Sequence, residues 1–242
     1  DYVQTPEVTT LMELDRERLL AELTGEEGNG ALAAFTDAAR DLKVWLHIGS
    51  MGIKLPEGRI ANRSYVIAPD GRIAARYDKI HMFDVDLDRG ESWRESATYE
   101  PGTKAVVTTL PFAKLGFAIC YDVRFPQLFR EEALAGAEIL TAPAAFTKQT
   151  GEAHWHALQR SRAIENGAYM ISAAQAGVHE DGRETFGHSM IVDPWGHMMT
   201  VANGTEPEII YADIDVSQSA AARAKIPNLK NARAFSVETA GV

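Results

Sequence analysis

Short apolar runs alternate with polar stretches along these 242 residues, and their spacing predicts a succession of helices and strands. In the first part we predict a strand at the very start, helices over 13–23 and 31–42, and strands over 44–50 and 105–110. Pro69-Asp70-Gly71-Arg72 is a strong turn signal, so residues 60–79 are predicted to form a hairpin that includes a strand over 64–68. Residues 81–103 are predicted to be a loop.

Helices and strands then follow one another more regularly. We predict strands over 115–120, 137–142 and 168–174, and helices over 125–135 and 152–165, which end at Gly136 and at Asn166-Gly167. From Phe186 onward we predict strands hinged on Asp193-Pro194-Trp195-Gly196, a strand over 209–214 and a helix near 217–224. This mixture is typical of a mixed α/β sandwich rather than a purely parallel, doubly wound sheet. Without a repeat or a linker, residues 1–242 are predicted to form a single domain.

The charge and the cysteine content of the chain limit which binding partners and which cellular locations are expected. The formal net charge is −10 and no basic run is present, which argues against a nucleic-acid partner. No apolar run is long enough for a membrane span and no signal-peptide pattern opens the chain, so we expect no membrane partner. One cysteine cannot form an internal disulfide, so a cytoplasmic location is predicted. Because the chain begins without methionine and in mid-strand, we expect the natural N-terminus to lie upstream.

Most familiar catalytic signatures are absent. The sequence holds no Walker loop, no G-x-G-x-x-G, no H-E-x-x-H, no C-x-x-C and no complete G-x-S-x-G. Asp84, Asp86, Asp88 and Glu95 occupy positions 1, 3, 5 and 12 of a calcium-loop template, but position 6, which requires glycine, is Arg89. We therefore interpret this stretch as an acidic, solvated loop. We expect neither a metal nor an organic cofactor.

Cys120 is the one residue whose position indicates chemistry. It ends the apolar run of GFAICYDVRFP (116–126), and the chain then enters a predicted helix. A lone cysteine is usually a small buried hydrophobe. At a strand-to-helix turn, however, the thiol lies at the end of a sheet and near helix N-terminal N–H groups, which favour a thiolate.

A nucleophilic thiol needs a neighbouring base or cation, because its ordinary pKa near ~8.5 leaves it mostly protonated at neutral pH. The chain has seven histidines, and none stands in a context that singles it out as the partner. A carboxylate in an apolar pocket can take the thiol proton instead, and an ammonium can stabilise the oxyanion. The residues alone leave the choice open.

Several blocks of sequence, taken in order, resemble the nitrilase (carbon–nitrogen hydrolase) superfamily, and in particular its Nit-type amidases. The resemblance covers essentially the whole chain. The blocks are Thr5-Pro6-Glu7, residues 76–84 (RYDKIHMFD), 94–96 with 101–102, 116–122 (GFAICYD), 144–146, 150–151 with 154–155, 187–190 (GHSM) and 193–196 (DPWG).

The resemblance implies a set of roles. Glu7 is the general base, Lys79 the cation that stabilises the oxyanion, Cys120 the nucleophile and Glu95 a second carboxylate. The Tyr121 backbone N–H joins Lys79 at the oxyanion, and Phe146 and Thr150 are pocket-wall candidates. Asp122 and Arg124 are expected to brace the Cys120 turn.

The resemblance also implies a fold and a class of substrate. The fold is an α-β-β-α sandwich with mixed sheets that pairs into a homodimer or higher homo-oligomer, and the family's first strand and helix are missing from this chain. The reaction is hydrolysis of the terminal amide of a small carboxylate to acid and ammonia through a thioester. Deaminated glutathione is the first candidate substrate, because residues 173–177, His179 and Arg183 resemble that branch. The alternatives are an ω-amidase acting on α-ketoglutaramate and an N-carbamoyl amidohydrolase. Lys148, Arg124 and Arg183 are candidate cations for the substrate carboxylate.

Overall fold

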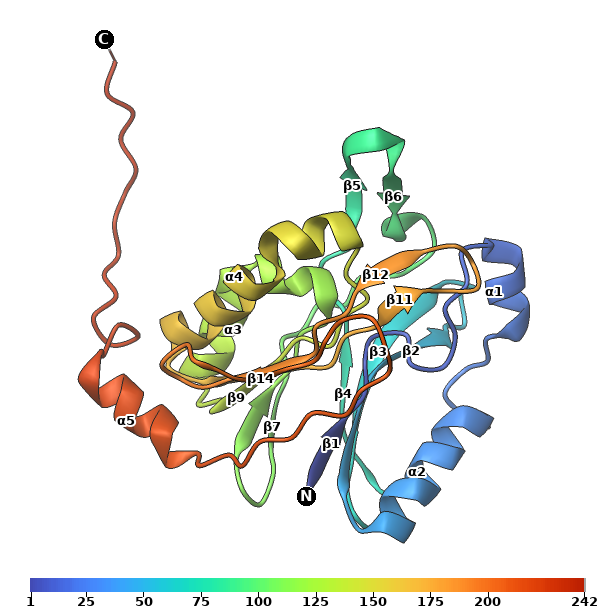
Figure 1. Ribbon diagram of the computed structural model, residues 1–242, viewed down its shortest axis with the longest axis horizontal. Coiled ribbons are helices and arrows are strands. Elements are labelled where there is room, and N and C mark those ends of the chain that lie inside the picture. The colour runs from blue at the N-terminus through green and yellow to red at the C-terminus, as the bar shows by residue number, and fades with distance from the viewer. Residues whose placement is uncertain (242) are drawn as a thin grey trace.

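Two β-sheets packed face to face, with helices outside both of them, make up the computed structural model (Figure 1). The structure describes residues 1–241 apart from the side chain of Arg89, so the side chain at position 6 of the calcium-loop template lies outside the described part. This is the α-β-β-α sandwich that the sequence resemblance implied. Within the described residues, no helix is both long and apolar enough to cross a bilayer.

The first sheet has four strands in the order β1-β2-β3-β4. Their bounds are Tyr2–Gln4, Trp45–Lys54, Ile60–Ile67 and Ile73–Asp78. β1 pairs in parallel with β2, whereas β2, β3 and β4 form an antiparallel meander around the turn at Gly71. Gly71 has a φ of 84°, a conformation that glycine adopts without strain.

The second sheet has six strands in the order β14-β13-β10-β9-β8-β7. In chain order they are β7 (Val107–Thr109), β8 (Lys114–Gly116), β9 (Ile139–Thr141), β10 (Tyr169–Ser172), β13 (Met190–Val192) and β14 (Met198–Val201). The three central strands β8, β9 and β10 are parallel and the others antiparallel, so the sheet is mixed as predicted.

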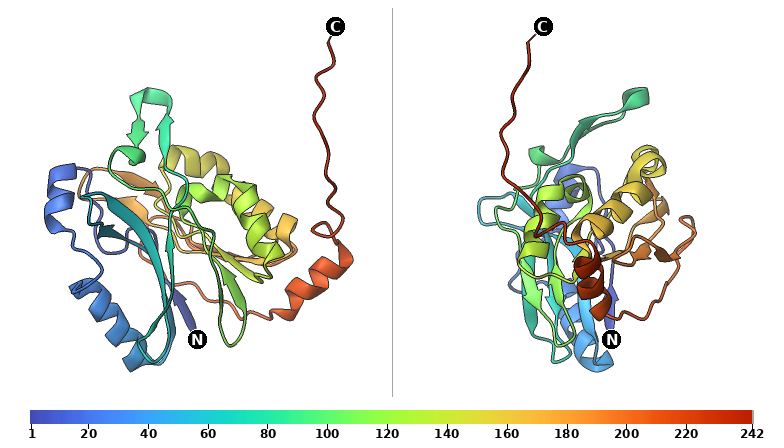
Figure 2. Two further views of the ribbon diagram at one scale, coloured as in Figure 1. Left: turned by 180° about the vertical axis from the view of Figure 1, so that it is seen from behind. Right: turned by 90° about the vertical axis from the view of Figure 1, so that its left-hand side faces the viewer.

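Helices cover the outer faces of the two sheets. Figures 1 and 2 show α2 (Gly30–Leu42) beside the first sheet, and α3 (Pro126–Leu134) with α4 (Lys148–Asn166) beside the second. Pro126 opens α3 at a position where its missing N–H costs nothing, and Gly167 ends α4 in the left-handed conformation. Two further helices, α1 (Arg16–Glu22) and α5 (Ser217–Lys225), flank the sandwich.

The core lies between the two sheets, where apolar side chains of both meet. Val66 and Tyr77 from the first sheet pack in one cluster with Leu115 and Phe117 from the second sheet and its extension. A second, smaller cluster between α2 and the first sheet includes Ile48, which is fully buried. Burial of this apolar surface stabilises the packing of the layers against each other.

Two short hairpins and three 3₁₀ turns extend beyond the sheets. The hairpins are β5 (Asp84–Asp86) with β6 (Ser92–Arg94) and β11 (Ala176–Val178) with β12 (Glu184–Phe186). The 3₁₀ turns are η1 (Asp88–Gly90), η2 (Glu95–Ala97) and η3 (Cys120–Arg124). The β5–β6 hairpin projects from the body of the molecule (Figure 1).

Three predictions about elements are wrong. Residues 81–103 are not simply a loop, because β5 and β6 form a hairpin whose strands are too short and too polar to show an alternation. Residues 209–214 have no strand partner among the described residues, and Ile209 and Tyr211 are 75% and 79% exposed. Cys120 does not end a strand: β8 stops at Gly116, and Cys120 begins a 3₁₀ turn. The other predicted elements are present, with boundaries that differ by a few residues.

Candidate active site

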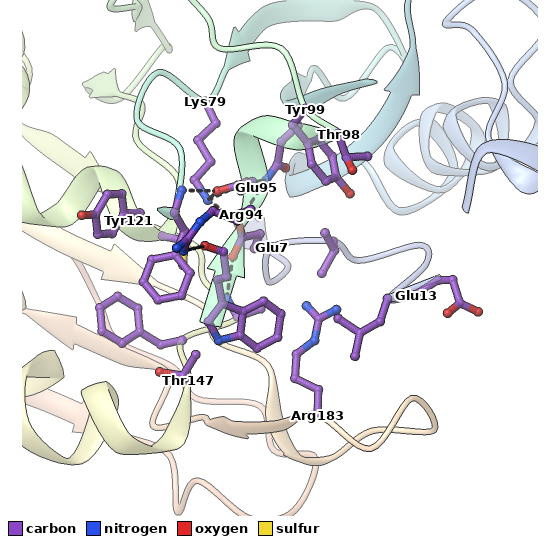
Figure 3. Close-up of a pocket in the computed structure, with 18 of the residues that line it drawn as sticks. Glu7, Glu13, Lys79, Arg94, Glu95, Thr98, Tyr99, Tyr121, Thr147 and Arg183 are labelled. Carbon is purple, nitrogen blue, oxygen red and sulfur yellow. Dashed lines mark hydrogen bonds and ion pairs between the residues drawn. The ribbon is translucent and has the colours of Figure 1, made fainter. Parts of the chain in front are cut away.

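A cavity of about 520 Å³ opens at one end of the sandwich and contains the residues singled out in the sequence. Its inner wall includes Glu7, Lys79, Glu95 and Cys120, which come from four separate segments (Figure 3). The outer wall comes from α1 and the segment before it, from the β5–β6 hairpin, and from Arg183 on the β11–β12 hairpin.

Cys120 stands on a turn with an unusual backbone conformation. Its φ is +49°, in the left-handed region that non-glycine residues rarely adopt. The Cys120 N–H donates to the carbonyl of Pro143 at 2.9 Å, which ties the turn to the segment after β9. Such a turn presents the thiol to the cavity instead of burying it in the sheet, although Cys120 is only 8% exposed.

Asp122 braces this turn, as expected from the sequence. Its buried carboxylate accepts hydrogen bonds from the Tyr77 hydroxyl at 2.7 Å and from the Ile119 N–H at 2.9 Å. It also accepts from the His81 N–H at 3.0 Å and lies 2.7 Å from His81 Nδ1. One carboxylate therefore joins η3 to β4 and to the loop that follows it. Arg124 takes no part in the brace; its guanidinium lies over the rings of Tyr121 and Phe146.

Glu7 lies in the turn after β1 and is held from both sheets. Its Oε2 accepts from the Ala145 N–H at 2.7 Å, and its Oε1 from Asn62 Nδ2 at 2.9 Å. Gln175 Nε2 donates to the Glu7 carbonyl at 3.0 Å. The next residue, Val8, has a φ of +47°, so the chain turns sharply just beyond the carboxylate. The Glu7 side chain is therefore fixed in one orientation.

Lys79 lies between two carboxylates directly after β4. Its ammonium donates to Glu7 Oε1 at 3.1 Å and to both oxygens of Glu95 at 2.9 Å. Glu95, in η2, accepts in turn from the Phe83 N–H at 2.7 Å. Because Lys79 is 2% exposed, a buried charge is here compensated by two opposite charges, as such burial requires.

The electrostatics of the cluster keep Glu7 charged and Cys120 protonated at neutral pH. Burial raises the pKa of the Cys120 thiol, and the Glu7 charge raises it further, so that it lies well above the ordinary value despite the opposing Lys79 charge. Burial alone would raise the pKa of Glu7, but the Lys79 charge and hydrogen bonds from Cys120, Lys79 and Ala145 outweigh it, and the pKa is lowered. A charged carboxylate and a neutral thiol thus share one buried site.

Lys79 remains an ammonium throughout the ordinary pH range. Burial would lower its pKa, yet the negative charges of Glu7 and Glu95 raise it well above the usual value. A permanent cation beside the thiol can stabilise negative charge that develops on a substrate oxygen. The arrangement can therefore supply a nucleophile, a base and an oxyanion partner.

The remaining predicted residues fall into two groups. Tyr121, Phe146 and Thr150 line the cavity, and so does Arg183. Lys148 lies outside its lining and pairs with Glu184 at 2.6 Å. Arg124 is not part of the lining either, although its guanidinium lies 5.1 Å from the Phe146 ring centroid.

Many other residues that line the cavity were not predicted, and three of them bear on the polar groups described above. Asn62, Trp93 and Tyr99 all line the cavity, and Asn62 donates to the carboxylates of both Glu7 and Glu95. A buried amide in the apolar strand β3 is the signal that could have identified Asn62. Trp93 and Tyr99 lie in a stretch that carries no periodicity, and no pattern in the sequence points to them.

The acidic residues of the calcium-loop template are engaged in protein contacts. Asp84 accepts from the Ser96 N–H, Asp86 accepts two hydrogen bonds from Arg94, and Glu95 faces Lys79. Among the described residues, no group of three or more His, Cys, Asp or Glu side chains is arranged to hold a metal ion.

The fold and the site together define a class, a two-sheet α/β sandwich with a cysteine, a lysine and two glutamates in one cavity. The chain belongs to the carbon-nitrogen hydrolase family, whose model matches residues 1–224. The resemblance seen in the sequence is thereby confirmed, and the chain is a carbon–nitrogen hydrolase by family.

The chain is also similar to individual proteins, two of them named as amidases. The chain is 46% identical over 179 residues to the deaminated glutathione amidase of Yersinia enterocolitica, an alignment that covers 73% of this chain and 61% of that protein. It is 39% identical over 209 residues to the omega-amidase NIT2 of Mus musculus, covering 84% and 74%. The crystal structure of the C. elegans NitFhit protein superimposes with a TM-score of 0.88 at 33% identity, over 96% of this chain and 57% of that one. This chain therefore spans less than two thirds of the Yersinia protein and of the NitFhit chain.

Proposed function

We propose that this protein is a cysteine-dependent amidase that hydrolyses the amide of a small carboxylate through a thioester, without a metal or an organic cofactor. The observation that carries the proposal is the buried cluster of three groups in one cavity: the Cys120 thiol, the Glu7 carboxylate and the Lys79 ammonium. Each of these groups supplies one requirement of acyl transfer.

In the first half-reaction, Glu7 takes the thiol proton while the sulfur of Cys120 attacks the amide carbon. The carbonyl oxygen becomes an oxyanion next to Lys79 and the N–H of Tyr121. Glu7 then donates its proton to the amide nitrogen, the C–N bond breaks, the amine leaves and a thioester remains.

In the second half-reaction, the same carboxylate activates water. Glu7 takes a proton from a water molecule as the oxygen attacks the thioester carbon, and the oxyanion again faces Lys79. Collapse of this intermediate breaks the C–S bond, and the sulfur regains its proton from Glu7. The acid leaves, and the site returns to its starting state. Glu95 accepts two hydrogen bonds from Lys79 and thereby orients the ammonium.

We propose deaminated glutathione as the first substrate to test, because the most identical of the relatives described above carries that activity in its name. For this substrate the leaving group is not ammonia, as expected from the sequence, but an amine. Glutathione is a tripeptide, so the amide of its deaminated form is secondary, and cleavage releases cysteinylglycine and α-ketoglutarate. Ammonia leaves only from a primary amide.

The second candidate is α-ketoglutaramate, which the similarity to the omega-amidase of Mus musculus favours. It has the same acyl half as deaminated glutathione and differs only in the leaving group, which is ammonia. Both reactions therefore yield α-ketoglutarate. One assay for that product can compare the two substrates directly.

Cys120→Ala tests the proposed chemistry. We expect α-ketoglutarate release from either substrate to fall by at least about 10³-fold, because the covalent route is lost. The variant should keep the wild-type melting temperature within a few degrees, since Ala fills most of the space of the small thiol. Turnover that persists in Cys120→Ala would contradict the thioester mechanism. Failure of wild type on both compounds would exclude both substrates.

We also propose that the protein is a cytoplasmic homodimer, as the resemblance to its family implied. Phe235 and Val237, on the segment after α5, are 87% and 85% exposed, and Figure 2 shows this segment leading away from the sandwich. In the proposed dimer, a second copy of the chain would cover these two side chains. Sedimentation velocity at micromolar concentration tests the dimer, and a single monomeric species would contradict it.

A further inference from the structure

Among the described residues, Arg183 is the one cavity-lining cation held in place by both an aromatic and an acidic neighbour. Its guanidinium carbon lies 5.0 Å from the centroid of the Trp93 ring, a cation–π distance, and its Nη2 donates to Asp181 Oδ2 at 3.2 Å. The side chain is 17% exposed, so the guanidinium is partly desolvated and restricted in rotation before any ligand arrives. These features describe a preorganised binding group.

The hydrogen-bonding capacity of Arg183 is only partly used. Its Nε is buried and finds no hydrogen-bond partner among the described residues, and the bond to Asp181 is the one its side chain makes there. A guanidinium offers five N–H donors in a planar fork that matches a carboxylate. By contrast Arg94, another cavity-lining arginine, already donates two hydrogen bonds to Asp86.

The charges next to Cys120 do not by themselves attract an anionic substrate. Glu7, Glu95 and Lys79 together carry one net negative charge, which repels an anionic substrate. Arg183 lies in the same space, because it lines the same cavity as Lys79 and Tyr99. An anion placed against Arg183 would therefore lie within the cavity that contains Cys120.

The position of Arg183 relates it to the leaving group. Gln175, directly before β11, donates to the backbone of Glu7, so the β11–β12 hairpin lies on the side of the residue that protonates the amine. In the view of Figure 3, Glu7 appears between Tyr121 and Arg183, and the Arg183 side chain points into the open part of the cavity. Arg124, in contrast, lies beside Phe146 and does not line the cavity.

From these contacts we infer that Arg183, stacked on Trp93, forms a subsite for a carboxylate on the amine half of the substrate. The inference rests on the proposed amidase function and adds a specificity to it. A substrate whose leaving group ends in a carboxylate, as cysteinylglycine does, gains a charge-assisted hydrogen-bonded pair. A primary amide that releases ammonia gains nothing at this subsite.

The test compares Arg183→Gln with wild type on three compounds. These are deaminated glutathione, its derivative with a glycinamide in place of the terminal glycine carboxylate, and α-ketoglutaramate. We expect Arg183→Gln to lower kcat/KM for deaminated glutathione about 10- to 100-fold, the range for one pair with a charged partner. The rate with α-ketoglutaramate should change less than about twofold, which also shows that the variant is folded. Wild type should disfavour the glycinamide by a similar factor, and Arg183→Gln should lose that preference.

Two further variants serve as controls. Arg183→Lys keeps the charge without the planar fork and should fall between wild type and Arg183→Gln. Lys148→Gln removes a cation that contacts the same hairpin through Glu184 but does not line the cavity, and it should leave all three rates unchanged. Equal losses on all substrates would overturn the subsite, as would full activity of Arg183→Gln on deaminated glutathione.

Binding separates this inference from the proposed chemistry. Calorimetric titration of Cys120→Ala with deaminated glutathione and its glycinamide reports recognition without turnover. A preference of about tenfold or more for the free acid that disappears in Cys120→Ala/Arg183→Gln would support the subsite, whatever the turnover results. Equal affinity of Cys120→Ala for the two compounds would overturn it. Loss of turnover in Cys120→Ala concerns the chemistry alone.

Discussion

Glu7 and Cys120 form a pair in which the proton stays on sulfur until substrate arrives. The thiol pKa is raised mainly by burial and then by the Glu7 charge, whereas Lys79 opposes both effects. A resting thiol of this kind differs from the thiolate of a cysteine–histidine pair, and it reacts only when the base removes the proton during attack. We therefore expect the proposed activity to depend on the carboxylate and not on a preformed thiolate.

Glu7→Gln separates the effect of the carboxylate on the thiol pKa from its effect on turnover. Removing the carboxylate charge eliminates one of the two main causes that raise the Cys120 pKa, while the Lys79 charge that lowers it remains. We expect the pH midpoint of Cys120 alkylation by iodoacetamide to move to lower pH, whereas kcat falls by about 10²- to 10⁴-fold because the base is gone. Since the chain has a single cysteine, mass spectrometry of the alkylated protein reports on this site alone.

Glu57→Gln, which changes an exposed acid outside the cavity lining, serves as the control. An alkylation midpoint that stays or rises in Glu7→Gln would show that the carboxylate does not face the thiol.

Sequence order predicted a set of residues that the structure brings together, but not how the cavity around them is completed. Glu7, Lys79, Glu95 and Cys120 stand in motifs whose order is informative, and the structure brings them together. Trp93, which was not predicted, contributes its ring beneath Arg183. That contact depends on the packing of two hairpins far apart in the chain, which no local pattern encodes.

At the scale of elements, the Cys120 turn depends on contacts from outside itself. A φ of +49° at a non-glycine residue costs free energy, of order 1 to 3 kcal/mol, and persists only where the surroundings impose it. Asp122 supplies that constraint, because its carboxylate joins η3 to Tyr77 and His81. The turn is therefore predicted to relax when the brace is weakened.

Asp122→Asn tests the brace. The amide of asparagine keeps one oxygen that accepts hydrogen bonds, but an NH₂ group replaces the other oxygen. At least one of the groups that now donate to Asp122 therefore loses its acceptor. We expect unfolding free energy to fall by about 2 to 4 kcal/mol, as for other buried charged groups with several hydrogen bonds. We also expect kcat to fall more than KM rises, since the nucleophile is misplaced. Urea denaturation and steady-state kinetics measure the two effects.

Asp41→Asn, which changes an exposed acid on α2, is the control. Wild-type kcat in Asp122→Asn would show that the turn holds its shape without the brace.

The elements that sequence reasoning missed have a common physical cause. The strands of both small hairpins are three residues long, too short for alternation to be visible. Residues 209–214 show the opposite error, because a strand-like composition there finds no partner strand within the described chain. Pairing is a tertiary property, and strand propensity is informative only where a neighbouring edge is available.

At the scale of the whole molecule, His47 lies where the two sheets meet. It belongs to β2 in the first sheet, and its ring lies edge-on to that of Phe117, 5.2 Å between centroids, from the extension of β8 in the second. Ser64 donates its single hydroxyl proton to the Ile48 carbonyl, so it accepts from His47 Nε2 at 2.7 Å. His47 Nδ1 then accepts from the Tyr2 hydroxyl at 2.6 Å. The imidazole is therefore neutral in the folded state.

This buried neutral imidazole is expected to make stability depend on pH. Burial lowers the pKa of His47 from 6.5 to about 3, whereas the unfolded chain restores the ordinary value. Between these values the unfolded state binds a proton that the folded state excludes, so acid favours unfolding. The contribution of His47 is complete above pH 6.5 and is lost as pH falls, at about 1.4 kcal/mol per pH unit between about pH 6 and 4.

His47→Gln isolates this contribution, because glutamine keeps a donor and an acceptor but does not titrate. The free energy of unfolding, measured by urea denaturation at pH 7, 6 and 5, should fall less steeply for the variant than for wild type. The difference between the two slopes should approach the value for one proton, whatever stability the variant loses at neutral pH. Slopes that are parallel over the same range would mean that water reaches the imidazole, and hence that the interface between the sheets opens to solvent at its β1 edge.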